Sequence, residues 1–446
     1  MSRAPVSTAS ASTASTSTAS TSTARAARVA SASAALAALL ALTVMACGSK
    51  AAPPAGATAG AGITSPALAT ALAAPGGEGW AVVEMGGSAA QDDNFWELFS
   101  RAAGGSWKLA TPPGVASNGG LIAAVTGPGS LLTAFRPSQD LTFSPLALTP
   151  DGGTHWSEGN PVPAGLADVP GALAEAHGRL LALTEAGAVN TSANQGAAWT
   201  RLTTLRALSR TAAARACGLT SLTAAAWTPA GQPLVAGDCS RAGRTGILTL
   251  SGGTWRSAAP ALPAALRGDR VSVIGLSTGG QRTTAVLAAG SGASTVVIAA
   301  WSADGGTSWT QSPLLAAGLR TGRAIAGSDS AITSAPSVSF GTDGSVSIVL
   351  PGSNASAATS TAASTTGSSS AGRASGAVIG WQGTSWQRLP ALPAGTATLA
   401  TTPAGQPEAL AVHRGTLTVW TLSAAGAQSW IVAQAIGVQI PYGSSG

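Results

Sequence analysis

The sequence predicts an all-β fold built from a repeated unit of short strands, and three observations carry that prediction. Only 9% of the 446 residues are charged and only two are lysines, whereas helix-rich proteins rely on Glu, Lys, Leu and Arg. Short apolar segments with strand character recur along the chain between Gly, Pro and Asp-Gly turns. A short motif that ends in Trp also recurs, at intervals typical of one small sheet.

Residues 1–46 have the features of an export signal. Arg25 and Arg28 precede an apolar run that extends from Val29 to Ala46. A positively charged segment, an apolar segment and a small residue at the cleavage point together define a secretory signal peptide. We therefore expect this part of the chain to direct export.

Cys47 follows directly on this apolar run. The segment Val44-Met45-Ala46-Cys47 resembles the lipobox of bacterial lipoproteins, with Val44 in place of the usual Leu. The resemblance implies that Cys47 is lipidated and anchors the protein to the cell membrane, facing the extracytoplasmic side. An ordinary signal peptide with a coincidental Cys, or an uncleaved anchor helix, stays open as an alternative. Residues 47–76 are rich in Ala, Gly and Pro, and we expect them to form a flexible tether.

The folded body is expected over residues 77–446. Its clearest hairpin signal lies at 338–350, where apolar residues alternate with polar ones on both sides of an Asp-Gly turn. No stretch of the body sustains helical periodicity for a dozen residues, so we predict that the body is all-β.

The motif S/T-x-D-x-G-x-x-W occurs twice in full and once with Asn in place of Asp. Its fixed residues are Thr149, Asp151, Gly153 and Trp156 in one copy, Ser192, Asn194, Gly196 and Trp199 in the second, and Ser302, Asp304, Gly306 and Trp309 in the third. The motif resembles the Asp-box, or BNR, repeat of sialidase-type β-propellers. The resemblance implies structural turns at the blade periphery, away from the ligand pocket, so the two aspartates are not expected to be catalytic.

The spacing of the motif gives the number of blades. Seven Trp residues mark complete or partial copies, at positions 107, 156, 199, 255, 309, 386 and 430. Five of the six intervals are 43 to 56 residues long, close to the roughly 40–50 residues of a four-stranded blade. The sixth interval contains a Ser/Thr-rich insert at about 354–376, which we expect to be disordered. We predict a single β-propeller of seven four-stranded blades, with six or eight as alternatives.

Two further patterns concern the equivalence of the repeats and the closure of the ring. The hexapeptide Thr-Pro-Ala-Gly-Gln-Pro occurs at 228–233 and again at 402–407, which indicates equivalent places in two repeats. The segment 436–440 is expected to pair with the first blade and close the ring.

An enzymatic function of the sialidase type is the alternative to a binding function. The resemblance implies an arginine triad, a Tyr nucleophile paired with Glu, and an Asp acid/base. Arg136 lies in a Phe-Arg-Pro sequence that lacks the Ile of the family motif, and Tyr442 is the only Tyr of the chain. These two residues are candidates only if the protein is sialidase-like, and we commit to no catalytic residue.

Cys217 and Cys239 are the only thiols after Cys47, and we expect them to form a disulfide in an exported protein. Neither a metal nor a cofactor is expected, since the three His residues are scattered and no nucleotide-binding motif occurs. Nucleic acid is excluded as a partner, since the chain after Cys47 has 20 basic and 17 acidic residues.

The expected function is therefore that of a binding module at the cell envelope. Its partner is expected to be a cell-envelope glycan or another exported protein, and the module is expected to be a monomer. An assembly factor for a membrane complex is a further alternative, because the body also resembles the propellers of photosystem-assembly lipoproteins.

Overall fold

The structure is a computed structural model, and it divides the chain into two units, Met1–Ala57 and Thr58–Gly446. All described residues belong to the second unit, and they are 69–86, 94–112, 120–135, 146–159, 170–290, 296–316, 337–350, 378–382, 385–413, 415–423 and 429–438. Several expected features lie outside the described residues: the signal peptide, Cys47 with the tether as far as residue 68, the 354–376 insert, Arg136 and Tyr442.

The described strands form seven groups of consecutive antiparallel strands, which we call sheets. The first and the sixth of them are joined into one eight-stranded sheet, because their first strands pair in parallel, with Leu72 opposite Phe340. The first two sheets contain β1 (Thr70–Ala73), β2 (Gly79–Gly86), β3 (Asn94–Arg101) and β4 (Trp107–Leu109), then β5 (Leu121–Gly127), β6 (Ser130–Phe135), β7 (Leu146–Thr149) and β8 (Ser157–Gly159). The third and fourth contain β9 (Pro170–Ala176), β10 (Arg179–Thr184), β11 (Ala188–Ser192) and β12 (Thr200–Thr204), then β13 (Ala224–Trp227), β14 (Pro233–Gly237), β15 (Gly246–Ser251) and β16 (Thr254–Ser257). The fifth contains β17 (Val271–Gly279), β18 (Arg282–Ala289), β19 (Val296–Ser302) and β20 (Thr310–Gln311), with β21 (Leu315–Ala316) also paired to β19. The last two contain β22 (Ser337–Phe340), β23 (Val346–Val349), β24 (Val378–Gln382) and β25 (Ser385–Arg388), then β26 (Thr396–Thr401), β27 (Pro407–His413), β28 (Thr416–Leu422) and β29 (Trp430–Gly437).

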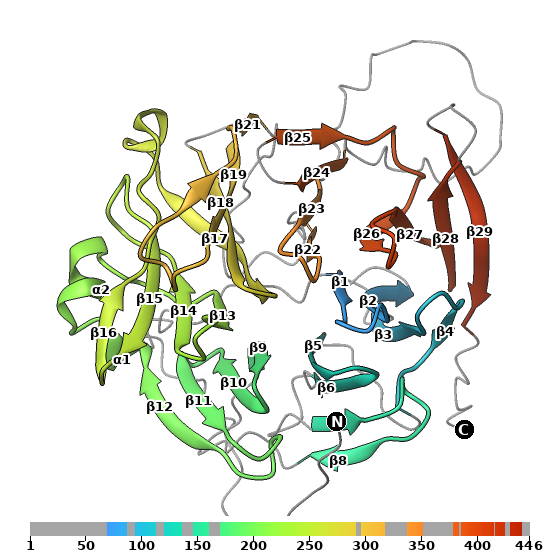
Figure 1. The fold of residues 1–446 in the computed structure, drawn as a ribbon, viewed down its shortest axis with the longest axis horizontal. Helices are drawn as coiled ribbons and strands as arrows, with labels where there is room; N and C mark the ends of the chain where they lie inside the picture. The colour runs from blue at the N-terminus through green and yellow to red at the C-terminus, as the bar shows by residue number, and fades with distance from the viewer. Residues whose placement is uncertain are drawn as a thin grey trace, which may run out of the picture. The chain divides into compact units, whose positions relative to one another are not determined.

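The sheets are arranged in a closed ring (Figure 1). The first strand of each sheet contacts the first strand of the next, in the order β1, β5, β9, β13, β17, β22 and β26, and β26 contacts β1 again. This is a β-propeller with seven four-stranded blades, so the predicted fold class is confirmed. Two short helices, α1 (Leu205–Leu208) and α2 (Ala212–Cys217), follow the third sheet, and a 3-10 turn, η2 (Ala264–Leu266), follows the fourth.

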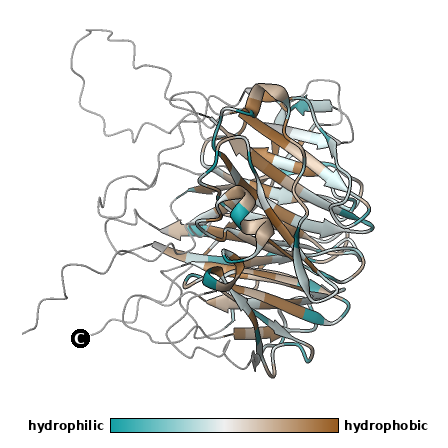
Figure 2. Cartoon of the chain, turned by 90° about the vertical axis from the view of Figure 1, so that its left-hand side faces the viewer, coloured by the Kyte–Doolittle hydropathy of each residue, from teal (hydrophilic) through white to brown (hydrophobic). Residues whose placement is uncertain are grey.

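The core lies between neighbouring sheets. The second strands are the most buried: every residue of β14 is buried, and so is every residue after the first in β10 and β18. Strands that are covered on both faces need apolar residues on both faces, which explains their nearly continuous runs of Leu, Val and Ala. Figure 2 shows these hydrophobic stretches inside the strands, with hydrophilic residues nearer their ends.

The direction of the strands determines at which end of the ring each strand-to-strand connection lies. Because the strands of each sheet are antiparallel, the turns after the first and third strands lie at one end, which we call the turn end. The connections after the second and fourth strands lie at the other end, which we call the connection end. The three motif turns, at 149–156, 192–199 and 302–309, follow third strands, so they lie at the turn end.

The repeated hexapeptide forms the same turn twice, after β13 and after β26. In the first copy Gly231 N–H donates to the carbonyl of Thr228 at 2.8 Å, and Gln232 N–H donates to Thr228 Oγ1 at 3.0 Å. In the second copy the corresponding distances, from Gly405 and Gln406 to Thr402, are 2.9 and 3.0 Å. The two segments occupy equivalent places in the fourth and seventh sheets, as the repeat predicts.

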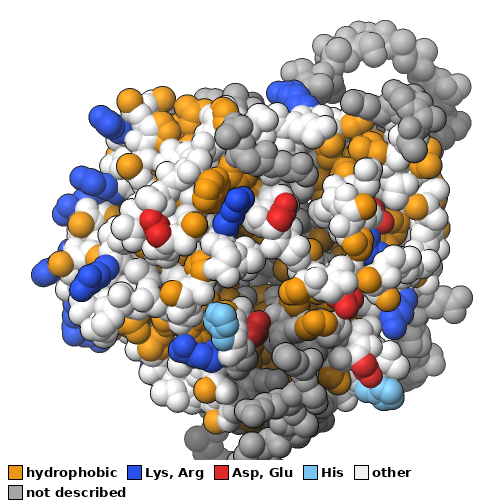
Figure 3. All heavy atoms as spheres, in the orientation of Figure 1, with side chains coloured by type: hydrophobic (Ala, Val, Ile, Leu, Met, Phe, Trp, Pro, Cys, Tyr) orange, Lys and Arg blue, Asp and Glu red, His pale blue; other side chains and the backbone are white. Residues whose placement is uncertain are grey.

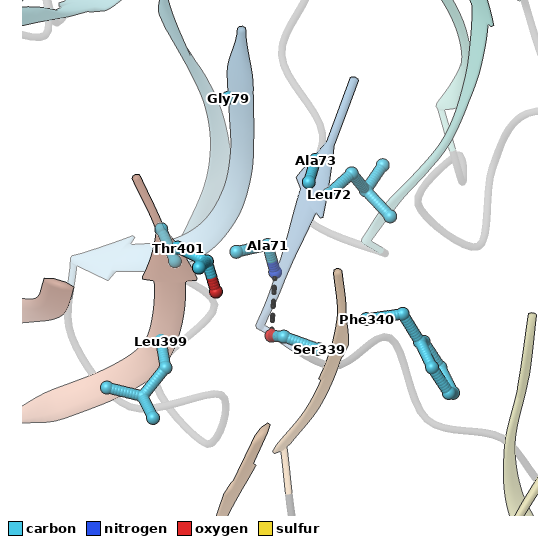
Figure 4. A pocket seen from close by; sticks show the side chains of 9 residues that line it. Ala71, Leu72, Ala73, Gly79, Ser339, Phe340, Leu399 and Thr401 are labelled. Atoms are coloured by element: carbon cyan, nitrogen blue, oxygen red, sulfur yellow. Dashed lines mark hydrogen bonds between the residues drawn. The ribbon is translucent and has the colours of Figure 1, made fainter. Parts of the chain in front are cut away.

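The first strands of three sheets meet at one buried junction (Figure 4). Ser339 Oγ of β22 accepts a hydrogen bond from the backbone N–H of Ala71 in β1 at 3.2 Å, and it lies 3.1 Å from Thr398 Oγ1 of β26. Ser337 Oγ of β22 donates to the carbonyl of Ala69 at 2.7 Å. The cavity left here is about 10 Å³, room for one water molecule at most. The junction is therefore structural and offers no space for a ligand.

The boundary of the body differs from the expected one. The first sheet begins at Thr70 and not at residue 77, since Thr70–Ala73 pairs with β2 along its whole length. This strand is rich in Ala and resembles the preceding tether in composition. Its small side chains suit the crowded junction, a property that only the packed ring reveals.

The expectation that segment 436–440 pairs with the first sheet is wrong for its described part. Ile436 and Gly437 pair with β28 in the last sheet. The Gln434 side chain makes the link to the first sheet instead. Trp107 N–H donates to Gln434 Oε1 at 2.9 Å, and Gln434 Nε2 donates to the Trp107 carbonyl at 2.7 Å. One side-chain amide thus takes the place of a strand pairing.

Candidate functional site

The 302–309 motif turn is held by hydrogen bonds to its conspicuous polar residues. Ser302 Oγ donates to Asp304 Oδ1 at 2.8 Å and accepts from the N–H of Gly306 at 2.8 Å. Asp304 Oδ1 also accepts from the N–H groups of Thr307 and Ser308, at 3.0 and 2.8 Å. The carboxylate therefore closes its own turn.

The other two motif turns repeat this arrangement. Thr149 Oγ1 donates to Asp151 Oδ1 at 3.0 Å and accepts from Gly153 N–H at 2.9 Å. Ser192 Oγ donates to Asn194 Oδ1 at 2.8 Å and accepts from Gly196 N–H at 2.9 Å. Asn194, which replaces the Asp in the 192–199 turn, keeps the acceptor oxygen that the turn requires.

Both motif aspartates are ionised at neutral pH. Hydrogen bonds from Ser308, first from its hydroxyl and then from its N–H, lower the pKa of Asp304 to about 2. The N–H of His155 and then its ring lower the pKa of Asp151 to about 2. An acid with so low a pKa is a poor proton donor near pH 7, which agrees with a structural role.

Cys217 and Cys239 form a disulfide, with their Cα atoms 5.3 Å apart. The bond connects the end of α2 to the connection between β14 and β15. A backbone hydrogen bond from Ser240 to the carbonyl of Gly218, at 2.9 Å, runs beside it. The pair thus holds two connections together at the connection end.

An open pocket of about 350 Å³ lies at the turn end. Figure 3 shows this face of the ring, with Lys, Arg, Asp and Glu side chains scattered over it. Three sheets contribute to it: Arg282 and Trp301 come from the fifth sheet, Asp343 and Trp381 from the sixth, and Gly405 from the seventh. This volume falls within the roughly 300–1,000 Å³ of ordinary small-molecule sites. It is the candidate functional site.

The turn that carries Asp343 is fixed from two directions. Thr284 of β18, which is buried, donates from Oγ1 to the carbonyl of Gly344 at 3.1 Å. Ser345 N–H donates to Asp343 Oδ1 at 2.9 Å. Gly344 has φ +81°, a conformation that glycine adopts without strain. The fifth sheet therefore positions a carboxylate of the sixth.

The pocket presents separated charges beside an aromatic ring. The Arg282 guanidinium carbon lies 4.6 Å from the centre of the Trp301 ring. Burial raises the pKa of Asp343, but hydrogen bonds from Ser345 and the charge of Arg282 outweigh it, so the net pKa is below the usual value. The ion pairs between described residues are Arg101–Glu408 and Asp151–His155. Arg282 and Asp343 are thus both charged without neutralising one another by direct contact.

A second Arg–Trp contact at the turn end joins the third sheet to the fourth, since Trp227 is the last residue of β13. Arg179 is the first residue of β10, as Arg282 is of β18. Its guanidinium lies 4.3 Å from the Trp227 ring centre, and Nη1 donates to the Gly231 carbonyl at 3.2 Å. This site offers a matched position for control substitutions.

Arginines that could form a triad of the sialidase type do not converge in the described part of the chain. Arg179 and Arg282 start second strands at the turn end, whereas Arg241 and Arg270 lie in connections at the other end. Arg136 and Tyr442 fall outside the described residues.

Sequence reasoning did not identify the pocket. It used Asp343 only as a turn residue and did not single out Trp301 or Trp381. No local signal marks them, because the three residues come from different strands and meet through the packing of the ring.

The described residues contain neither a metal-binding cluster nor a membrane-spanning helix. No group of three or more His, Cys, Asp or Glu side chains is placed to hold a metal ion there. Within the same residues, no helix has the length and apolar character needed to cross a membrane.

The comparisons with known proteins concern the fold. No protein-family model matches the chain, and no curated protein matches it. One similar solved structure is YCF48 bound to a D1 peptide, with 15% identity, 81% of this chain and 94% of that chain covered, and a TM-score of 0.42. Another is a GH74 xyloglucanase from Xanthomonas campestris, with 14% identity, 81% and 54% covered, and a TM-score of 0.46. A third is a putative 6-phosphogluconolactonase from Bacteroides fragilis, with 12% identity, 81% and 96% covered, and a TM-score of 0.46. At these identities and TM-scores the comparisons assign no activity to this chain.

Proposed function

We propose that this protein is a lipid-anchored, extracytoplasmic β-propeller that binds a cell-envelope glycan in its turn-end pocket. The observation that carries the binding function is the pocket shared by three sheets, with Arg282, Asp343 and Trp301 around it. An aromatic surface beside hydrogen-bond donors and acceptors suits a sugar, whose faces are apolar and whose edges carry hydroxyls. The three motif turns act as Asp-boxes that stiffen the blades around the pocket.

The presence of one carboxylate among the described lining residues of the pocket favours binding over hydrolysis. Asp343 is the one carboxylate among its described lining residues, and its pKa is lowered, so it stays ionised. Glycoside hydrolases use a pair of carboxyl groups, one of which must hold a proton as the general acid. A single ionised Asp and an Arg can instead accept from and donate to sugar hydroxyls.

A glycan array tests the binding site. We expect purified protein to retain a defined set of cell-envelope glycans, and Arg282→Gln and Asp343→Asn to weaken that binding by about tenfold or more, since a hydrogen bond to a charged group contributes about 1.5–3 kcal/mol. Arg179→Gln is the matched control, because Arg179 occupies the same strand position beside another Trp. Equal losses in Arg282→Gln and Arg179→Gln would contradict the assignment of the site.

The anchor is tested separately at Cys47. Labelling of cells with a palmitate analogue should mark the protein, and Cys47→Ser should abolish the label and release the protein from the membrane fraction. Persistent labelling of the Cys47→Ser variant would contradict lipidation at this residue.

A further inference from the structure

The connections around the fourth sheet carry a concentration of arginines that the net charge of the chain conceals. Seven exposed arginines lie in the segments 205–223, 238–245 and 258–270, and we call them the arginine surface: Arg206, Arg210, Arg215, Arg241, Arg244, Arg267 and Arg270. The only acidic residues in these segments are Asp238 and Asp269, which are partly buried. Figure 1 shows α1 and α2 beside β16, at the outer side of the fourth sheet.

The three segments form one assembly. The disulfide between Cys217 and Cys239 joins the first segment to the second. Arg241 Nη1 donates to the carbonyl of Ala216 at 3.2 Å, which adds a second link between them. Gly243 N–H donates to the carbonyl of Asp269 at 2.8 Å and so joins the second segment to the third. The arginines are therefore held on a fixed support.

The charges of this surface are not neutralised within the described part of the chain. No ion pair there involves any of the seven arginines, since the two recorded pairs are Arg101–Glu408 and Asp151–His155. Exposed like charges at close range repel one another, and an anionic partner relieves that repulsion.

The course of the chain indicates which anionic partner. The three segments are connections after second and fourth strands, so they lie at the connection end. The chain enters the ring at the same end, since β1 starts at Thr70 and reaches the turn end after Ala73. Only 22 residues separate Thr70 from Cys47, a span of at most about 75 Å when fully extended. A lipid on Cys47 would keep this end of the propeller close to the bilayer.

We infer that the arginine surface binds the anionic headgroups of the membrane that holds the anchor. The anchor and the surface then act as two linked contacts, and the tether gives the second contact a high effective concentration. The choice of a membrane as partner rests on the anchor proposed above, whereas the arginine surface itself does not. Such binding would orient the propeller with its turn-end pocket directed away from the bilayer.

The test compares partition of the full-length protein onto vesicles of phosphatidylcholine with and without phosphatidylglycerol. We expect a clear preference for the anionic vesicles, and a decline of that preference as salt is raised, because the Debye length falls from about 10 Å at 0.1 M to about 3 Å at 1 M. The ratio of the two partition coefficients removes the contribution of the lipid anchor, which acts on both kinds of vesicle.

Two triple variants with the same change in net charge separate this surface from charge in general. Arg210→Gln, Arg244→Gln and Arg267→Gln together should lower the ratio by about 100-fold, since each Arg near an anionic surface contributes about 1 kcal/mol, roughly fivefold, and the three factors multiply. The control replaces Lys108, Arg179 and Arg201 by Gln, outside the three segments, and should retain most of the preference.

Three results would overturn the inference. They are equal losses in the two triple variants, no preference of the unmodified protein for anionic vesicles, and binding to soluble polyphosphate without binding to the vesicles. A failed anchor gives a different outcome, because unlipidated protein would bind both kinds of vesicle less while the ratio between them persisted.

Discussion

The buried ion pair between Arg101 and Glu408 joins the first sheet to the last, and it leads to the sharpest stability prediction. The two residues are 3% and 7% exposed. Arg101 Nη1 bonds to Glu408 Oε2, and Nη2 donates to the carbonyl of Thr401 at 3.0 Å. Trp107 Nε1 donates to the same carboxylate oxygen at 3.1 Å. All of these groups lie where the ends of the ring meet.

Replacing Glu408 alone leaves a buried guanidinium without its counter-ion. Loss of one partner of a buried pair costs about 3–5 kcal/mol, so we expect Glu408→Leu to lower the free energy of unfolding by that amount. Replacing both partners by apolar residues is often close to neutral. The double variant Arg101→Leu/Glu408→Leu should therefore recover most of the loss. Urea titration followed by the fluorescence of the 13 Trp residues measures all three proteins.

The exposed pair between His155 and Asp151 supplies the control. The His155 side chain is 82% exposed, and an exposed pair contributes little. His155→Ala should leave the urea midpoint unchanged. If the double variant were as unstable as Glu408→Leu, the loss would come from packing, and the argument from an unpaired buried charge would be refuted.

Three further predictions concern the turns and the disulfide. A Cβ at Gly306 would lie 2.6 Å from the Cβ of Ala258, whereas one at Gly305 meets nothing closer than 3.7 Å. Gly306→Ala should therefore destabilise the protein by about 1–3 kcal/mol more than Gly305→Ala, measured by thermal or urea unfolding. Equal losses in the two variants would contradict the steric argument. Both positions have positive φ, which makes the backbone strain common to the two variants. Cys217→Ser/Cys239→Ser should lower the free energy of unfolding by about 3 kcal/mol relative to the oxidised unmodified protein. Reduction of the unmodified protein should cost the same amount. A clearly smaller loss would contradict the expected constraint on the unfolded chain across the 22-residue separation. The carboxyl of Asp304 should titrate near pH 2 when followed by NMR. Because its pKa is lower in the folded protein than in the unfolded chain, its stabilising effect should be present above about pH 4 and disappear as the pH falls toward 2. A titration midpoint near 4 would contradict the hydrogen bonds described for its turn.

Features that depend on a few neighbouring residues could be predicted from the sequence. The side-chain hydrogen bonds that close the motif turns each join residues no more than four positions apart, and those of the repeated hexapeptide start and end inside the repeat. Their geometry is therefore contained in the segment itself. The regular spacing of the motif then predicted the number of sheets, since each turn marks one sheet.

Features that depend on distant residues could not be predicted. The link between Gln434 and Trp107 spans 327 residues and uses a side chain in place of a strand, a substitution that no strand pattern signals. The segment Thr70–Ala73 has the composition of a tether, yet it occupies the centre of the ring. In both cases the partner determines the role, and the partner lies in another sheet.

The sequence by itself determined the all-β class, the repeat and the local turns, because strand alternation and turn chemistry act over a few residues. Only the tertiary structure decided where Arg282, Trp301 and Asp343 meet, since these residues come from two different sheets. It also decided that seven arginines share one support while the chain as a whole is nearly neutral after Cys47. The physical reason is the same for the pocket and the arginine surface. Closure of the ring sets the distances between residues far apart in the chain, whereas the composition gives only how many residues of each type the chain contains.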